Sequence, residues 1–85
     1  MIKVETIKEF LRIDHDLDDD YLLSLRNLAN EVCENYLREP LPEESVVSIK
    51  QAQLLIIAHF YENRSDAPIP DVVYRLLDAY RKEVF

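Results

Sequence analysis

The sequence predicts an all-α fold, a small bundle of two long and two short helices. Apolar residues recur at intervals of three and four along four segments, which is the period of a helix with one buried face. Two proline-containing stretches, residues 39–44 and 65–70, separate the last three of these segments. No segment shows the two-residue alternation of a half-buried strand. The 85 residues, 48% of them hydrophobic, are enough for a single domain spanning residues 1–85.

The first short helix is expected from about Thr6 to Arg12. Glu9 stands three residues after Thr6, which is the spacing of a capping box, where each of the two side chains accepts a hydrogen bond from the other residue's backbone N–H. The apolar residues of this segment are Ile7, Phe10, Leu11 and Ile13. The pattern therefore predicts a helix with one apolar face.

The acidic run from Asp14 to Asp20 is interpreted as the start of the second helix. Asp18 is able to cap the first turn, and the two aspartates that follow it lie at the positive end of the helix dipole. Leu17 and Leu22 have the spacing of a hydrophobic staple, in which a residue before the cap packs on the first turn. We therefore expect Asp18 to cap the helix and Leu17 to pack on Leu22.

The same run resembles a calcium loop, because Asp14, Asp16 and Asp18 occupy its first, third and fifth positions. A calcium loop also needs glycine at the sixth position and a bidentate glutamate at the twelfth. Asp19 and Leu25 stand at those places. Helix capping is the preferred interpretation, and calcium binding and contact with a partner are the alternatives.

The second helix is expected from about Asp19 to Arg38, before Pro40 and Pro42 stop it. Its predicted apolar face consists of Leu22, Leu25, Leu28, Ala29, Val32, Tyr36 and Leu37. Cys33 is the only cysteine, so no internal disulfide is possible. We expect it to be a half-buried helix residue and not a nucleophile.

The third helix is expected to be capped by Ser45 and to run to about Asn63. It is apolar on nearly every face from Leu54 to Tyr61, so its apolar side chains do not fit one stripe of the helix. The helix is either the central strut of the domain or partly covered by another copy. Domains of this size bury only about 60 to 65% of their unfolded surface, which makes an oligomer an expectation.

His59 lies within this apolar helix and is interpreted as a hydrogen-bonded interior or interface histidine. Glu62 follows it by three residues, which reverses the Glu-x-x-His order of di-iron sites. The apolar run from Leu54 to Ala58 is far shorter than the roughly 20 residues of a membrane span. We therefore expect neither a di-iron site nor membrane insertion.

The last helix is expected from about Asp71 to Glu83, after the loop from Ser65 to Pro70. Its predicted apolar face consists of Val72, Val73, Leu76, Leu77 and Tyr80. Two prolines in the preceding loop mark the start of the helix, because proline is favoured at such boundaries and disfavoured inside a helix.

The net charge of −7 opposes binding to nucleic acid, which needs a basic surface. The chain has no glycine, so the usual phosphate-cradling loops are absent. No local Ser-His-Asp or Cys-His arrangement appears. We therefore predict no enzyme activity, no catalytic residue, no cofactor and no metal site, although an active site assembled from distant residues stays open. No charged and apolar leader follows Met1, so we expect the chain to be made in a cytoplasm.

Three segments, taken in order, resemble the small head-tail connector proteins of long-tailed phages and prophages. The matching positions are Lys8, Leu11, Arg12, Ile13 and Asp14 in the opening, Tyr61 to Arg64 at a helix end, and Leu76, Leu77, Tyr80 and Arg81 near the close. The resemblance covers almost the whole chain. The short loop from Ser65 to Pro70 and the few residues after Arg81 depart from longer family members, so contacts made by such extensions are not expected here.

The resemblance implies a structural virion protein at the head-tail junction, made in the bacterial host cytoplasm. It implies a homo-oligomeric ring of about twelve all-α subunits that closes by rotation beneath the portal protein. The ring is expected to extend the DNA channel and to dock the next head-completion or tail protein. DNA is expected to pass through without specific binding, which the negative charge would favour.

Lateral contacts between subunits, or their immediate support, are predicted at Tyr36, Ile57 and Tyr61, with ordinary core residues as the alternative. Arg64 is also predicted at the oligomer interface, where we expect it to form a structural ion pair with an acidic residue of the same or a neighbouring chain; a charge that complements the helix dipole is the alternative. A portal contact is predicted at the end of the last helix and at the tail, at Tyr80, Arg81, Val84 and Phe85.

Two other functions compete with the connector. One is an acidic helical binding protein that acts as an inhibitor or regulator of a phage or host enzyme by occupying a basic surface. It explains the charge but not the apolar third helix or the ordered motifs. The other is a small metal-dependent enzyme that uses the acidic run and His59, and it predicts a stoichiometric metal in the purified protein.

Overall fold

The structure, a computed structural model, describes residues 2–63 and 67–83. It contains four helices, α1 (Val4–Leu11), α2 (Asp19–Leu37), α3 (Val47–Glu62) and α4 (Asp71–Glu83). Two of them are long, with 19 and 16 residues, and two are shorter, with 8 and 13. No strand occurs in the described ranges. The predicted all-α bundle of two long and two short helices is therefore confirmed.

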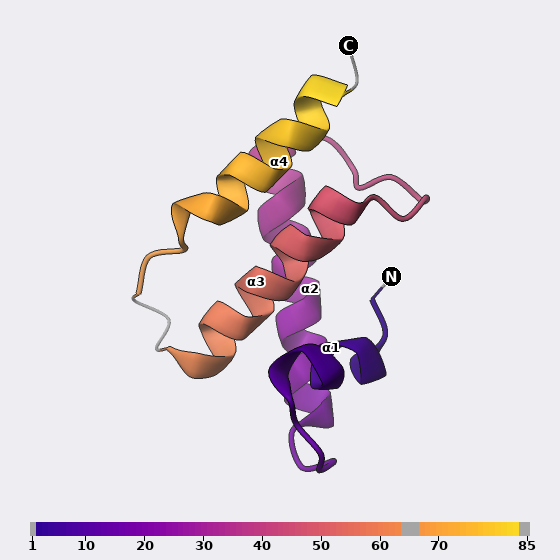
Figure 1. The fold of residues 1–85 in the computed structure, drawn as a ribbon, viewed down its shortest axis with the longest axis vertical. Coiled ribbons are helices and arrows are strands. Elements are labelled where there is room, and N and C mark those ends of the chain that lie inside the picture. The colour runs from indigo at the N-terminus through magenta and orange to yellow at the C-terminus, as the bar shows by residue number, and fades with distance from the viewer. Residues whose placement is uncertain (1, 64–66, 84–85) are drawn as a thin grey trace.

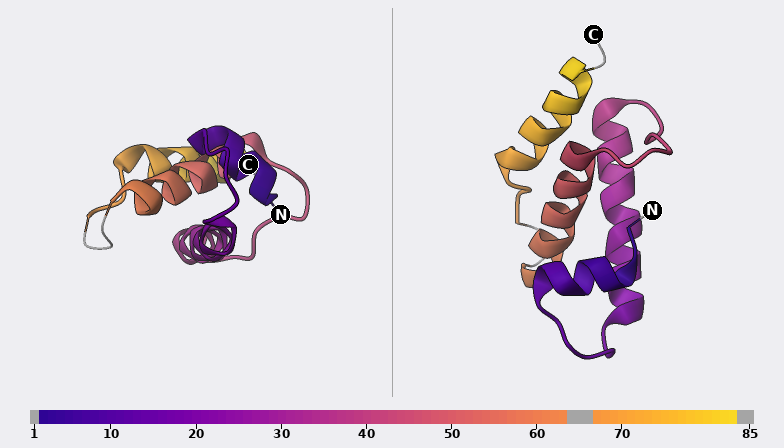
Figure 2. Two further views of the ribbon diagram at one scale, coloured as in Figure 1. Left: turned by 90° about the horizontal axis from the view of Figure 1, so that it is seen from below. Right: turned by 45° about the vertical axis from the view of Figure 1, so that its right-hand side comes forward.

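The helices form a flattened bundle with principal extents of 42, 28 and 18 Å. α3 lies between α2 and α4, while α1 crosses the lower ends of α2 and α3 (Figure 1). Seen from below, α2 forms one layer, which packs on a second layer that holds α3 and α4 (Figure 2). No helix of the described residues is long and apolar enough to cross a membrane.

The apolar character of α3 is explained within one chain. Ile56 and Ile57 are fully buried, and Ile49, Ala52 and Leu54 are also buried. α1, α2 and α4 all pack on α3, so different faces of the helix meet different neighbours. Within the subunit, α3 is therefore the central helix of the domain. Its apolar faces are no longer evidence for an oligomer, which must form through other surfaces.

The hydrophobic core joins all four helices. Its fully buried large side chains are Ile7, Leu22, Cys33, Ile56, Ile57, Val73 and Leu77. Cys33 is fully buried, where half-burial was expected, because α2 turns this position directly into the core. Burial also raises the pKa of the Cys33 thiol to about 11, which disfavours the reactive thiolate.

The predicted capping box of α1 is wrong. The helix begins two residues earlier, at Val4, and Lys3 precedes it in an extended conformation without a side-chain cap. The N–H of Ile7 already donates to the carbonyl of Lys3 at 3.2 Å, so Thr6 lies inside the first turn. Ile2 is buried and Val4 packs against the core, and this tertiary contact explains the earlier start.

The predicted cap and staple of α2 are also wrong, although the helix begins at the expected residue, Asp19. Asp18 occupies the cap position, but its side chain makes no capping hydrogen bond. Leu17 remains 88% exposed while Leu22 is fully buried, so the two do not form a staple. The side chain of Asp18 instead accepts a hydrogen bond from the hydroxyl of Tyr61 in α3.

Ser45 does not cap α3, which corrects a further prediction. Val46 occupies the cap position in an extended conformation, and its carbonyl accepts the first helical hydrogen bond from Lys50 N–H at 2.9 Å. At the other end, Asn63 stops the helix in an extended conformation. The His59 carbonyl accepts two hydrogen bonds from Asn63, one from its backbone N–H and one from its side-chain amide, each at 2.9 Å.

α1 and α2 both end on an arginine in the left-handed conformation, Arg12 with φ 60° and Arg38 with φ 58°. After α1, Ile13 N–H donates to the carbonyl of Lys8 and Arg12 N–H to the carbonyl of Glu9, which is the Schellman pattern. Glycine normally fills such positions because a side chain is strained there. A chain without glycine therefore carries this strain at two helix ends.

Replacing Arg38 with glycine is expected to raise the free energy of unfolding by roughly 0.5 to 1 kcal/mol, because it removes the strain of a left-handed arginine. Equilibrium urea unfolding measures the change. Arg75→Gly is the matched control, since Arg75 lies exposed within α4, where the same change should destabilise by about 1 kcal/mol. A loss of stability in both variants would contradict the prediction for Arg38.

Candidate functional site

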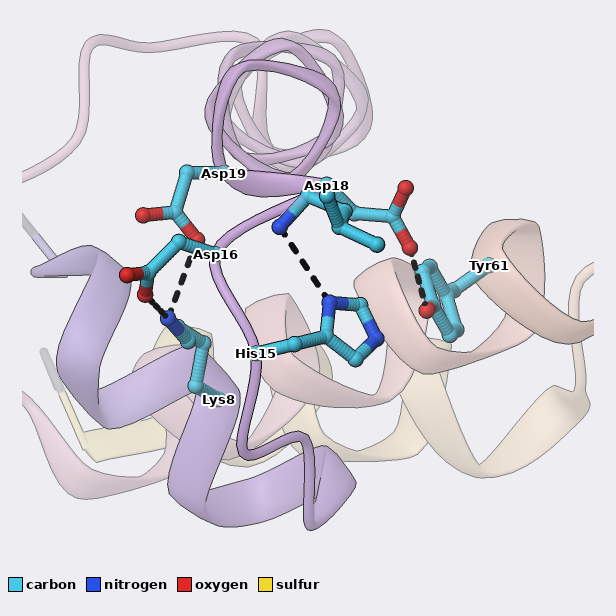
Figure 3. Close-up of polar contacts among 7 residues, drawn as sticks. Lys8, His15, Asp16, Asp18, Asp19 and Tyr61 are labelled. Atoms are coloured by element: carbon cyan, nitrogen blue, oxygen red, sulfur yellow. Dashed lines mark hydrogen bonds and ion pairs between the residues drawn. The ribbon is translucent and has the colours of Figure 1, made fainter.

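A clasp at the lower end of the molecule joins α1 to the start of α2 (Figure 3). Lys8 Nζ lies 2.5 Å from Asp16 Oδ1 and 3.1 Å from Asp19 Oδ1. The hydrogen bonds to Asp16 and Asp19 raise the pKa of Lys8, and the hydrogen bond from Lys8 lowers the pKa of Asp16. The acidic run therefore folds back onto α1 through one lysine.

A second contact of the same loop reaches α3 (Figure 3). The Tyr61 hydroxyl donates to Asp18 Oδ2 at 2.7 Å, and this hydrogen bond raises the pKa of Tyr61. The Leu17 N–H donates to His15 Nδ1 at 3.2 Å, which shapes the turn between the two contacts. The Tyr61 ring also packs against Tyr21 of α2, with ring centroids 6.3 Å apart.

The three aspartates that suggested a calcium loop have separate partners. Asp16 binds Lys8 and Asp18 accepts from Tyr61, while Asp14 is exposed. Within residues 2–63 and 67–83, no group of three or more His, Cys, Asp or Glu residues could hold a metal ion. The geometry of the loop thus favours a structural role over the calcium alternative.

The contact of Lys8 with Asp16 and Asp19 should make the stability of the fold sensitive to acid. A carboxyl group whose folded pKa lies below its unfolded value adds stability above the unfolded pKa, and this stability is lost as the pH falls through the folded pKa. Asp16 has such a lowered pKa, with an ordinary value of 3.8. The melting temperature of Lys8→Met should therefore fall less than that of the wild type between about pH 5 and about pH 2.

Thermal unfolding monitored by circular dichroism across this pH range tests the prediction. Lys50→Met is the matched control, because Lys50 is exposed and lies outside the clasp. The control should keep the acid sensitivity of the wild type. Equal acid sensitivity in all three proteins would show that the clasp adds no pH-dependent stability.

A second clasp, near the upper end of the molecule, joins α2 to α4. The Tyr36 hydroxyl donates to Asp78 Oδ1 at 2.8 Å, and this hydrogen bond raises the pKa of Tyr36. Arg81 Nη2 donates to the backbone carbonyl of Tyr36 at 2.8 Å, and the guanidinium lies 5.2 Å from the centroid of the Tyr36 ring. Tyr74 packs on the same ring at a centroid distance of 4.9 Å.

The residues predicted at lateral contacts are thus engaged within the subunit. Tyr36 and Tyr61 are half-buried and donate their hydroxyl hydrogens to carboxylates of their own chain. Ile57 is fully buried, so it has no surface to offer a neighbour. Arg64 lies outside the described residues. The role of these residues at a lateral contact stays a prediction. Their burial and their bonds within the chain fit residues that support a contact surface better than residues that touch a neighbour.

The residues predicted to contact the portal lie at the end of α4. Tyr80 is half-buried and packs against the core, while Arg81 is exposed and belongs to the upper clasp. Val84 and Phe85 lie outside the described residues. The portal contact also stays a prediction.

His59 is hydrogen-bonded and half-buried, as expected of an interior or interface histidine. Its Nε2 lies 3.0 Å from the carbonyl of Ala67, in the segment that leads to α4. Its ring also meets Phe60 edge-on at 5.1 Å between centroids. The contact ties the end of α3 to the segment before α4 and gives the residue a structural role.

Two adjoining hollows lie at the start of α3, with volumes of about 510 and about 680 Å³. They share Thr6, Ser45 and Lys50. The larger hollow is lined by Ile2, Lys3, Thr6, Asn30, Glu34, Leu41, Pro42, Glu43, Glu44, Ser45, Val46, Ile49, Lys50 and Gln53. At its base Gln53 is buried and donates from Nε2 to Asn30 Oδ1 at 2.6 Å. No local pattern in the sequence marks this surface, because its residues come from separate segments.

The negative charge of the chain is concentrated on α2 and its flanking loops. Residues 14–44 contain ten Asp and Glu residues against two Arg, whereas the rest of the chain has seven acidic and eight basic residues. α2 forms one layer of the bundle and packs on α3 (Figure 2), so the helix that carries much of this excess lies on one side of the molecule. Such a side repels nucleic acid and attracts basic surfaces.

Comparison with known proteins assigns the chain to a family. A family model of phage gp6-like head-tail connector proteins matches residues 1–81 of the 85 residues. The chain belongs to this family. Searches of curated proteins and of solved structures returned no match.

Membership of the connector family confirms the resemblance read from the ordered motifs. It makes the chain a phage head-tail connector and a virion component that associates with parts of the head and the tail. The connector family is a structural one.

Proposed function

We propose that the chain is the subunit of a ring of about twelve copies that lies beneath the portal protein. The ring extends the DNA channel and docks the next head-completion or tail protein. DNA passes through it without specific binding. The observation that carries this proposal is the connector-family match over residues 1–81, which covers α1, α2, α3 and all but the last two residues of α4.

The distribution of charge supports a channel role. α2 and its flanking loops carry a large excess of carboxylates, and such a surface repels the phosphates of DNA. A channel wall that bound phosphates would slow the passage of DNA, because each bound phosphate releases counterions and adds affinity. The proposal therefore places the acidic side of the subunit toward the DNA.

Two hydrogen bonds between helices support the ring by holding the subunit in one shape. Tyr61 with Asp18 fastens the lower end of α2 to α3, and Tyr36 with Asp78 fastens the upper end of α2 to α4. A rigid subunit loses less conformational freedom on assembly, which favours a closed ring. Arg81 and Tyr80 lie beside the upper clasp, where the proposal places the portal contact together with Val84 and Phe85.

Native mass spectrometry over a concentration series tests the ring, with the purified chain alone and with its cognate portal protein. A closed species of about twelve subunits in either sample is the expected result. A strict monomer in both samples, at every concentration, would overturn the proposed ring. A monomer that competes with nucleic acid for a basic enzyme surface would support the acidic inhibitor or regulator instead.

A further inference from the structure

We propose that neighbouring copies meet by seating the start of α4 of one subunit in the hollows at the start of α3 of the next. This inference rests on the ring proposed above and names the two surfaces that form it. The receiving surface is the pair of adjoining hollows, here called the α3 hollow. The inserted surface, here called the α4 knob, consists of Pro68, Pro70, Asp71, Val72 and Arg75.

The α3 hollow has a mixed lining, in which apolar side chains lie among polar and charged ones. Val47 is 83% exposed and Phe10 is 39% exposed at the smaller hollow. Leu41 and Pro42 line the larger one. Exposed apolar side chains around a depression are typical of a surface that a partner covers.

The α4 knob is an exposed segment that carries both apolar and charged side chains. Pro68 and Pro70 are exposed, and Val72 at the first turn of α4 is 47% exposed. Asp71 and Arg75 are exposed and stand four residues apart, so they lie on one face of the helix, one above the other. The knob thus presents an apolar centre beside one negative and one positive charge.

The charges of the two surfaces are complementary. The α3 hollow carries Lys50 from α3 and Lys3 from the N-terminal segment, and two glutamates of the α2–α3 loop, Glu43 and Glu44, all four of them exposed. Glu9 and Glu34 also line it, and the half-buried Glu34 accepts a hydrogen bond from Leu41 N–H at 3.1 Å. The two lysines match the aspartate of the knob, and the two glutamates match its arginine. Charge matching of this kind selects the partner and fixes its register.

The positions of the two surfaces suit a ring. All three views place the start of α4 on one side of the molecule, and the loop after α2 with the N-terminal segment on the opposite side (Figures 1 and 2). A head-to-tail contact between different surfaces closes into a ring when the rotation per subunit completes a circle. Contacts on nearly opposite sides require only a small rotation, and a small rotation gives a ring of many subunits.

Charge reversal tests the pairing. Arg75→Glu is expected to weaken self-association by at least about tenfold, since it places a third carboxylate beside two glutamates. Adding Glu43→Arg and Glu44→Arg to this variant should restore association, because the signs are then exchanged on both sides. Glu31→Arg is the control, since Glu31 is exposed on α2 and lines neither hollow. Native mass spectrometry, with and without the portal, measures the assembly of each variant.

Disulfide trapping gives an independent measurement. A chain with Glu44→Cys and Arg75→Cys should form a ladder of cross-linked multimers on mild oxidation, whereas each single variant should form dimers at most. Cys33 stays silent because its thiol is fully buried. If rings form but this cross-link does not, or if rings still form in Arg75→Glu, the proposed contact is wrong although the proposed ring stands. A chain that never self-associates, alone or with the portal, overturns the ring and the inference together.

Discussion

Ile57→Ala is expected to lower the free energy of unfolding of the isolated subunit by about 2 to 4 kcal/mol. Ile57 is fully buried on the central helix, so its truncation removes apolar contacts and leaves a cavity that the neighbouring helices only partly fill. A domain of this length has a total stability of about 4 to 13 kcal/mol. The loss is therefore a large share of the whole, and a clear fall in melting temperature should accompany it.

Urea unfolding at a concentration where the chain is monomeric measures this loss without a contribution from association. Val47→Ala is the matched control, because Val47 lies on the same helix and is 83% exposed. Its stability should change by no more than about 0.5 kcal/mol. If Ile57→Ala were as stable as the control, Ile57 would not be a core residue, and its predicted place at a lateral contact would regain support.

The helices were predictable because their signals are local. The periodic apolar positions and the two proline-containing loops predict α2 and α4 to within a residue of their observed bounds. The start of α1 was misplaced by two residues and that of α3 by one, since Lys3 and Val46 precede them without side-chain caps. Cap patterns in a sequence mark where a cap is chemically possible, whereas contacts of Ile2 and Val4 with the core decide where α1 begins.

The contacts that shape the candidate site were not predictable, because their partners are far apart in the chain. Tyr61 and Asp18 are 43 residues apart, and Tyr36 and Asp78 are 42 apart. The sequence placed both tyrosines correctly on helix faces that meet the core, but it gave no signal for their carboxylate partners. Lys8 and Asp16 are eight residues apart across a loop, a spacing that corresponds to no helical contact.

The composition of the third helix was compatible with two different structures. A helix that is apolar on every face must be wrapped, but the wrapping can come from its own chain or from another copy. Here three other helices of the same subunit supply it. The proposed contact surfaces therefore lie elsewhere: the α3 hollow combines residues from separate segments, and the α4 knob is a short segment with no recognisable pattern in the sequence.

Leu77→Ala is expected to lower the free energy of unfolding by about 2 to 5 kcal/mol, because Leu77 and Val73 are the fully buried side chains that anchor α4. The upper clasp cannot compensate for this loss. The hydrogen bond between Tyr36 and Asp78 lies near the surface, where water competes for both groups. Tyr36→Phe should therefore cost less stability than Leu77→Ala in the same urea titration, and the reverse order would contradict this account of α4.

Hydrogen exchange then separates local from global loosening in Leu77→Ala. Weakened anchoring should speed the exchange of α4 amides more than that of α2 and α3 amides, because α4 lies at the edge of the bundle. A loosened α4 also displaces the α4 knob, so Leu77→Ala should assemble poorly. Arg75→Glu should assemble poorly with its stability unchanged, since Arg75 is exposed. Assembly lost in both variants, with stability lost only in Leu77→Ala, would show that α4 acts in the ring as a docked surface.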